Sequence, residues 1–197
     1  MPVAVWYHAL TMKNILLGIT GTDGAGKGTV VKYLVEHKGF VHYSARALLI
    51  EKLTARNEEL TRANMRLIAN ELRAECGNDY LVTHYLARRA EDKPERCIIE
   101  SIRTVGEAET LKANGGILIA VDADQAVRYA RVQERRSETD RVSFEQFAAH
   151  EALEANDPDP HGMQKPKVIA MADYVIMNNG SIAELEQAVE GLCAALI

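Results

Sequence analysis

A glycine-rich turn between an apolar strand and a helix constrains this chain more than any other stretch. The turn, GTDGAGKGT, runs from Gly21 to Thr29. The apolar run 14–20 before it predicts a buried strand, and the helical spacing of apolar residues in 28–38 predicts a helix after it. Glycines let the backbone N–H groups of such a turn converge on phosphate oxygens, and the new helix directs its positive end to the same point. The pattern predicts a phosphate-binding loop around Lys27.

The residue after the lysine departs from the common pattern. In most phosphate loops a serine or threonine follows the lysine and binds Mg²⁺ directly. Here Gly28 has that place, and the hydroxyl comes one residue later, at Thr29. We therefore expect a magnesium ion to be held mostly through water, the nucleotide and more distant carboxylates.

The rest of the chain alternates short apolar runs with helical patterns. Further strands are predicted at residues 40–44, 96–101, 117–123 and 172–179. Such alternation favours a parallel sheet with helices on both faces. With 197 residues, of which 47% are hydrophobic, we expect a single domain from residue 12 to 197 after a disordered extension at 1–11. Residues 44–91 are expected to form a helical acceptor-binding region, and residues 128–160 a lid.

Charge and cysteine content exclude several classes of function. The net charge of −5 gives no electrostatic footprint for nucleic acid or an anionic membrane. The cysteines at positions 76, 97 and 193 indicate neither a disulfide framework nor a zinc site, and a cytoplasmic location is expected. The six histidines have no metal-ligand spacing, and the carboxylates between His150 and Gly162 are expected to form a solvated helix end and loop.

The loop resembles that of adenylate kinases, which typically read G-x-x-G-x-G-K-G-T. The matching residues are Gly21, Gly24, Gly26, Lys27, Gly28 and Thr29. Asp23 stands where adenylate kinases usually carry proline; an acid there is similar to thymidylate kinases, whose loop however has serine after the lysine. The resemblance is to the nucleoside-monophosphate-kinase superfamily without selecting a member. It implies a P-loop NTPase fold of three α/β/α layers, about five parallel strands in the order 2-3-1-4-5, and a short helical lid.

Three arginines recur along the helix after the fourth strand. Arg128, Arg131 and Arg135 are spaced i, i+3 and i+7, which places them on one helix face. The spacing of Arg131 and Arg135, followed by the polar stretch 135–141, is similar to the lid helices of dephospho-CoA kinases and adenylate-kinase-related proteins. The resemblance implies that both stabilise the transferring phosphoryl group. A solvated face with surface salt bridges is the alternative.

Candidate acceptor-binding residues follow the third strand. Glu100 ends that strand and Arg103 lies just beyond it, at the sheet edge where open parallel sheets bind ligands. The segment is similar to the D-G-x-R segment of nucleoside-monophosphate kinases, with Glu100 in place of aspartate and Ser101 in place of glycine. Arg103 would then bind an acceptor phosphate, and Glu100 would hold Mg²⁺ through water or accept a proton. Arg46 and Arg73 are further candidates, although Arg73 could equally be a surface residue.

The last predicted strand and its turn, ADYVIMNNGS, resemble the carboxyl-terminal segment of dephospho-CoA kinases that lies beside the adenine of ATP. Asn178, Asn179 and Gly180 would then shape the base pocket through side-chain amides and backbone groups. Ser181 and Glu184 also have the spacing of a helix cap, and both roles are compatible.

These features predict an ATP-dependent small-molecule kinase that uses Mg²⁺. The predicted ATP-binding residues are Gly21, Gly24, Ala25, Gly26, Lys27, Gly28, Thr29, Asn178, Gly180 and Ser181; the catalytic residues are Asp23, Lys27, Glu100, Arg131 and Arg135; the metal-binding residues are Thr29 and Glu100. The predicted acceptor is a phosphate-bearing small molecule, a (deoxy)nucleoside monophosphate. A dephospho-CoA-kinase-like enzyme stays open as an alternative, as does an ATPase or switch module without an acceptor.

Overall fold

The computed structural model describes residues 14–134, 143–155, 157 and 159–196. Its sheet is parallel and has the order β2-β3-β1-β4-β5. The strands are β1 (Ile15–Gly21), β2 (Val41–Ser44), β3 (Arg96–Glu100), β4 (Ile117–Asp122) and β5 (Tyr174–Met177). The predicted fold class and strand order are confirmed. The predicted extension at 1–11 lies outside the described residues.

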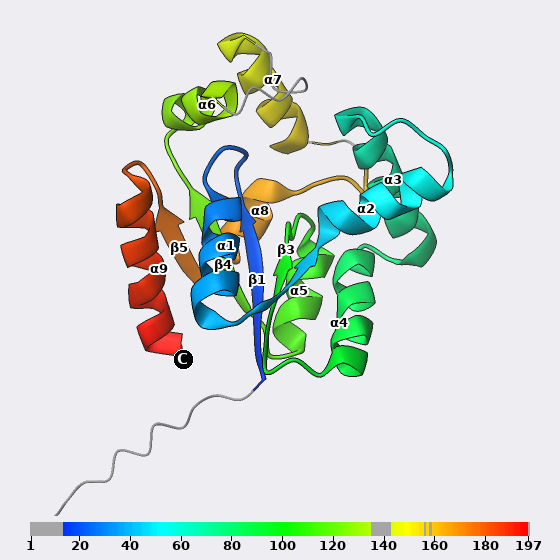
Figure 1. Cartoon of the computed structure of the whole chain (residues 1–197). Helices are drawn as coiled ribbons and strands as arrows, with labels where there is room; N and C mark the ends of the chain where they lie inside the picture. The colour runs from blue at the N-terminus through cyan, green and yellow to red at the C-terminus, as the bar shows by residue number, and fades with distance from the viewer. Residues whose placement is uncertain (1–13, 135–142, 156, 158, 197) are drawn as a thin grey trace, which may run out of the picture.

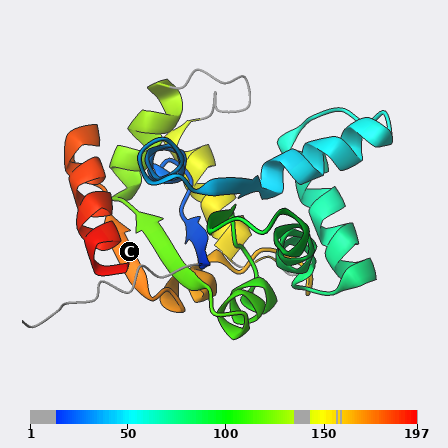
Figure 2. The same cartoon turned by 60° about the horizontal axis from the view of Figure 1, so that its bottom comes forward.

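Helices cover both faces of the sheet (Figure 1). One face packs against α1 (Lys27–Lys38) and α9 (Ile182–Leu196). The other packs against α2 (Ala45–Ala55), α4 (Tyr80–Asp92), α5 (Val105–Ala113) and α8 (Lys165–Ala170). Helix α3 (Arg62–Cys76) packs on α2, and Figure 2 shows this pair on the side of the molecule opposite α9.

Strand β1 shows how the sequence makes two cores. Ile15, Leu17 and Ile19 point to the α1–α9 side, while Leu16 points to the other side, as the period of two in a strand requires. Gly18 also faces the second side, and a Cβ there would lie 2.2 Å from Cδ2 of Leu111 on α5. A glycine at this point therefore lets α5 pack close to the central strand.

The carboxyl ends of the strands meet at one edge of the sheet. The phosphate loop lies at this edge, with α6 (Gln125–Glu134) and α7 (Phe144–Ala155) beyond it (Figure 1). Helix α8 was not expected from the sequence; it has a proline in its first turn, a position that proline favours. Among the described residues, no helix is both long and apolar enough to cross a membrane.

Candidate functional site

The phosphate loop has the backbone that its glycines predict. Gly21, Gly24 and Gly26 have φ angles of 131°, 81° and 101°, which disfavour residues with a side chain. A Cβ on Gly21 would lie 1.9 Å from the carbonyl oxygen of Val121 on β4, and one on Gly24 would lie 2.6 Å from that of Arg128 on α6. The loop is thus held against β4 and α6, and α1 begins at Lys27 with its free N–H groups at the loop.

Lys27 lies folded over this loop. Its Nζ donates to the carbonyl oxygens of Gly21 and Thr22, at 3.1 and 2.7 Å, and lies 3.8 Å from Oδ1 of Asp23. Burial lowers the pKa of Lys27 to about 8, although the charge of Asp23 acts in the opposite direction. A buried cation next to the loop can bind the β- and γ-phosphates of a nucleotide.

Asn178, which directly follows β5, also supports the phosphate loop. Its buried side-chain amide donates to the carbonyl oxygen of Ala25 at 2.8 Å. Arg131 donates to the carbonyl oxygens of Asn178 and Gly180, at 2.7 and 2.9 Å. Three predicted site residues, Asn178, Gly180 and Arg131, are therefore brought together at the β5–α9 turn.

Ser181 has the capping role that its spacing with Glu184 predicts. Its hydroxyl group donates to Oε2 of Glu184 at 2.8 Å and accepts from the backbone N–H of Glu184 at 3.3 Å. These contacts fix the start of α9 next to the β5–α9 turn, where the base of a nucleotide is expected.

Arg128 has a different environment from Arg131, although both are on α6. It is buried, donates to the carbonyl oxygens of Ala123 at 2.8 Å and Asp23 at 3.3 Å, and forms an ion pair with Glu151 of α7. Arg128 therefore holds α6, α7 and the phosphate loop together. Arg135 lies outside the described residues.

Asp122, at the carboxyl end of β4, is a polar residue of the site that we did not predict. It accepts a hydrogen bond of 2.5 Å from the hydroxyl group of Thr22 in the phosphate loop. Nε of Arg128 lies 3.8 Å from its carboxylate. Asp122 therefore fixes the first turn of the loop to β4, beside the arginine that fixes α6.

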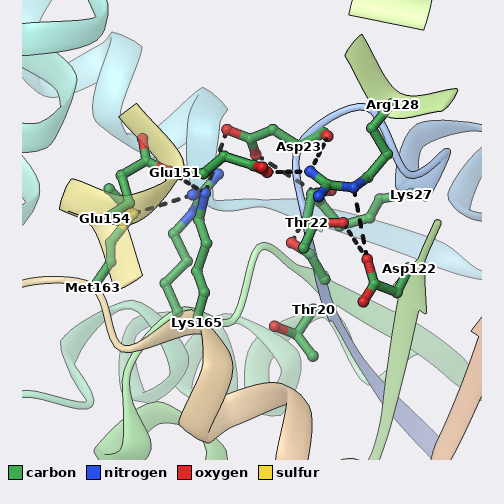
Figure 3. Close-up of polar contacts among 12 residues, drawn as sticks. Thr20, Thr22, Asp23, Lys27, Asp122, Arg128, Glu151, Glu154, Met163 and Lys165 are labelled. Carbon is green, nitrogen blue, oxygen red and sulfur yellow. Dashed lines mark hydrogen bonds and ion pairs between the residues drawn. The ribbon is translucent and has the colours of Figure 1, made fainter. Parts of the chain in front are cut away.

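An ion-paired cluster surrounds Asp23 on the side of the phosphate loop away from Asp122 (Figure 3). Oδ2 of Asp23 lies 2.5 Å from Arg62 of α3 and 3.3 Å from Lys165 of α8. Glu154 of α7 joins the same two cations: Oε1 lies 2.7 Å from Arg62, and Oε2 bonds to Lys165. Burial alone would raise the pKa of Asp23, but the cations around it, Lys165 first, hold it well below its usual range. The expectation of solvated carboxylates near His150 is therefore wrong for Glu151 and Glu154.

Glu100 ends β3 close to Lys27, and His42 of β2 lies beside it. Oε2 of Glu100 lies 3.0 Å from Nε2 of His42, and this hydrogen bond lowers the pKa of Glu100. An ionised carboxylate here suits a hydrated Mg²⁺ ion. Thr29, the other predicted metal-binding residue, lies in the first turn of α1. Among the described residues, no cluster of three or more His, Cys, Asp or Glu side chains is placed to enclose a metal. The donor set thus fits a metal held largely by water and phosphate.

Arg103 lies beyond Glu100, in the loop after β3. Its Nη1 contacts Sδ of Met163 at 3.1 Å, and a thioether is a weak acceptor. In the part of the chain that the structure describes, the guanidinium group therefore has donors left for an anion. Ser101, which replaces the glycine of the D-G-x-R segment, has a φ of 70°, the left-handed conformation that glycine favours.

The other two predicted acceptor residues lie elsewhere. The side chain of Arg73 is 1% exposed and pairs with buried Glu107 at 2.9 Å, so its environment does not fit the predicted role of binding an acceptor. A charge buried at this depth needs a partner, and Glu107 supplies it. Arg46 is exposed on α2, and its Nη1 lies 3.4 Å from Sδ of Met65 on α3.

Sequence reasoning missed Arg62, Asp122, Glu154 and Lys165. Asp122 could have been predicted from the sequence, because it lies at the carboxyl end of a strand, as Glu100 does. The other three are ordinary surface-type residues on helices, and only the packing of α3, α7 and α8 around the loop brings them together.

Comparisons with known proteins find a family model and relatives that match most of the chain. The family model described as an AAA domain matches residues 17–159. A UPF0200 protein from Aeropyrum pernix is 30% identical over 176 residues, which are 88% of this chain and 89% of the relative. One from Methanothermobacter thermautotrophicus is 28% identical over 178 residues, 89% of this chain and 87% of the relative.

Solved structures show the same fold. The structure of TT1252 from Thermus thermophilus aligns with a TM-score of 0.61 at 23% identity, over 94% of this chain and 99% of its own. A shikimate kinase from Acinetobacter baumannii, in complex with shikimate, aligns with a TM-score of 0.56 at 17% identity, over 93% of this chain and 95% of its own.

Proposed function

The chain belongs to the UPF0200 family and carries an AAA-type P-loop domain with a kinase-like fold, and on that premise we propose that it is an ATP-dependent phosphotransferase acting on a small molecule. The acceptor would be a phosphate-bearing metabolite rather than a nucleic acid. The reaction would transfer the γ-phosphoryl group of ATP to an acceptor oxygen, leaving ADP.

The observation that carries this proposal is a set of cations beside Asp23 of the phosphate loop, namely Arg62, Lys165 and Arg103. Arg103 lies close enough to Asp23 to help lower the pKa of that carboxyl group. Among the described residues, the hydrogen-bond acceptor of its side chain is a thioether, which is a weak one. Phosphoryl transfer needs positive charge on both the donor and the acceptor side, because charge develops on the migrating group between them. A module that only binds or hydrolyses ATP needs no cation reserved for an acceptor.

The site residues take the following roles in this proposal. Lys27 binds the β- and γ-phosphates, and Arg103 binds the acceptor's phosphate. Glu100 holds a hydrated Mg²⁺ ion or accepts the acceptor's proton. The turn formed by Asn178, Gly180 and Ser181 binds the base, and Arg131 stabilises the migrating group. We propose the same role for Arg135, which lies outside the described residues.

We propose a (deoxy)nucleoside monophosphate as the acceptor. The segment 172–181 favours a dephospho-CoA-kinase-like activity instead, because its sequence is similar to the adenine-side segment of those enzymes. Shikimate kinases among the structural neighbours add a hydroxy acid to the acceptors worth testing.

The test is a coupled assay of ADP release from Mg-ATP over a panel of nucleoside monophosphates, dephospho-CoA and shikimate. We expect one acceptor to raise turnover well above the acceptor-free rate, and Lys27→Ala to abolish the increase. ATP hydrolysis at the same rate with every acceptor would favour the ATPase module. Near-wild-type transfer by Lys27→Ala would contradict the assignment of the phosphate loop.

A further inference from the structure

Glu154 bridges two cations in the way that a phosphate group would. Its two carboxylate oxygens are divided between Arg62, at 2.7 Å from Oε1, and Lys165, which bonds Oε2. The side chains of Glu154 and Lys165 are each 8% exposed, so this half of the bridge is buried, whereas Arg62 is half-exposed. Phosphate oxygens bind paired cations with the same divided geometry.

The three bridged residues belong to different parts of the fold. Arg62 begins α3 in the predicted acceptor region, Lys165 begins α8, and Glu154 is on α7 in the predicted lid. Asp23 connects this group to the phosphate loop, because its carboxylate contacts the same two cations, Arg62 and Lys165, that Glu154 bridges. Figure 3 shows Glu154 and Lys165 next to Asp23, away from the Asp122–Arg128 contacts.

The charges of this cluster leave room for a dianion in place of Glu154. Arg62, Lys165 and nearby Arg103 are positive, and Asp23, which also faces Lys27 of the phosphate loop, offsets at most one of them. Without Glu154 the group therefore has about two positive charges, which matches a phosphate monoester near neutral pH. With Glu154 in place, the group keeps about one uncompensated positive charge.

We propose that Arg62 and Lys165 form the subsite for the acceptor's phosphate group, and that the carboxylate of Glu154 occupies this subsite until the acceptor displaces it. The inference rests on the proposed function, since it names where that acceptor binds. It makes Arg62 and Lys165 binding residues, with Arg103 beside them, and Glu154 a competitor carried by α7. Binding of the acceptor would release the Glu154 bridge and change how α7 contacts the loop.

Competition between Glu154 and the acceptor's phosphate predicts the sign of the change in phosphate affinity when Glu154 is replaced. Removing a competitor tightens binding of the ligand, because the apparent affinity rises with the fraction of free subsites. Removing a group that merely supports the site weakens binding. The neutral variant Glu154→Gln therefore separates the two roles by the sign of the effect.

The experiment is calorimetric titration of inorganic phosphate into protein whose donor site is saturated with Mg²⁺ and a non-hydrolysable ATP analogue. We expect Glu154→Gln to bind phosphate several-fold to about tenfold more tightly than the wild type. Lys165→Met should bind it at least about tenfold more weakly. Glu151→Gln is the matched control, because it removes the same charge one turn earlier on α7 from a group that pairs with Arg128.

Folding is checked by circular dichroism and thermal unfolding. If buried Lys165→Met fails to fold, Arg62→Gln replaces it, because that side chain is 47% exposed. Unchanged or weaker phosphate binding by Glu154→Gln would overturn the proposal, as would a tightening that Glu151→Gln reproduces in full. Phosphate binding needs no transfer step, so failure of the whole acceptor panel would contradict the proposed function without changing these affinities.

Discussion

The side-chain amide of Asn178 donates to the backbone carbonyl of Ala25 at 2.8 Å, although 153 residues separate them. The contact joins the edge strand β5 to the middle of the phosphate loop. Gly26 makes it possible, because a Cβ on that residue would lie 2.5 Å from Nδ2 of Asn178. The shape of the phosphate loop therefore depends on the last strand as well as on its own glycines.

The first prediction follows from this contact. Asn178→Ala leaves the carbonyl of the buried residue Ala25 without its donor, so we expect a loss of about 1–3 kcal/mol in the free energy of unfolding. ATP should also bind more weakly, because the loop loses its support. Urea unfolding and calorimetric titration with Mg-ATP measure the two effects. The control is Asn179→Ala, since Asn179 is exposed and accepts from the backbone of Asp124 instead; equal loss of ATP affinity in both variants would contradict the role of Asn178.

The second prediction concerns the cost of holding Lys27 in a buried position. Burial lowers the pKa of Lys27 from 10.5 to about 8, so the charged lysine is less stable in the folded protein than in the unfolded chain. This difference corresponds to a cost of roughly 3 kcal/mol at neutral pH. We expect Lys27→Met to abolish ATP binding and yet raise the free energy of unfolding by about 1–3 kcal/mol at pH 7, the loss of the bonds to Gly21 and Thr22 offsetting part of the gain.

The protonation of Lys27 also predicts how the free energy of unfolding changes with pH. Below pH 8 the lysine is protonated in both states and the full cost is present. Between pH 8 and 10.5 the unfolded chain binds more protons than the folded protein, so wild-type stability rises with pH. The stability advantage of Lys27→Met should therefore shrink over this range, as measured by urea unfolding at both limits. An advantage that stays constant or grows would rule out this account of the burial.

How far the sequence predicts the site depends on the range of each interaction. The backbone of Gly21, Gly24 and Gly26 follows from local conformational preference. The alternation of strands and helices predicts a parallel sheet, whereas the strand order came from the resemblance to nucleoside-monophosphate kinases. The ion pair between Glu154 and Lys165 does not, because α8 had no recognised pattern and neither residue stands out in composition. Arg128 and Arg131 show the same limit. Their helical spacing predicts a shared face, but only packing decides that one contacts α7 and the other the β5–α9 turn.

The third prediction tests the meaning of Gly28. A Cβ at this position would meet no atom within 4 Å, and the residue lies inside α1, so a side chain fits without strain. Gly28→Ser should stabilise the protein by about 0.5 kcal/mol through helix propensity. It should also lower the Mg²⁺ concentration needed for half-maximal turnover, because a hydroxyl group there can bind the metal directly. Gly28→Ala is the control, as it adds the propensity without the hydroxyl; the same Mg²⁺ dependence in both variants would count against a metal held through water.

The last prediction separates two arginines that the sequence offered as acceptor ligands, Arg103 and Arg73, the second with a surface position as its alternative. Arg73 and Glu107 form an ion pair with side chains 1% and 0% exposed, and Glu107 also accepts from the backbone N–H of Arg103 at 2.7 Å. Arg73→Met leaves a buried carboxylate without its cation, so we expect a loss of about 3–5 kcal/mol in the free energy of unfolding. Arg103→Met removes a side chain that donates to a thioether, a weak acceptor, and the stability of this variant should stay close to that of the wild type.

The binding measurements should show the opposite order. With the donor site filled by an ATP analogue, Arg103→Met should weaken phosphate binding about tenfold or more, whereas Arg73→Met should leave it nearly unchanged wherever the variant is folded. The double variant Arg73→Met, Glu107→Gln keeps the capping contacts of residue 107 and removes the unpaired charge, so it should recover part of the lost stability. If Arg73→Met instead weakened phosphate binding as strongly as Arg103→Met at unchanged stability, Arg73 would be an acceptor ligand after all and the buried pair would have to open during binding.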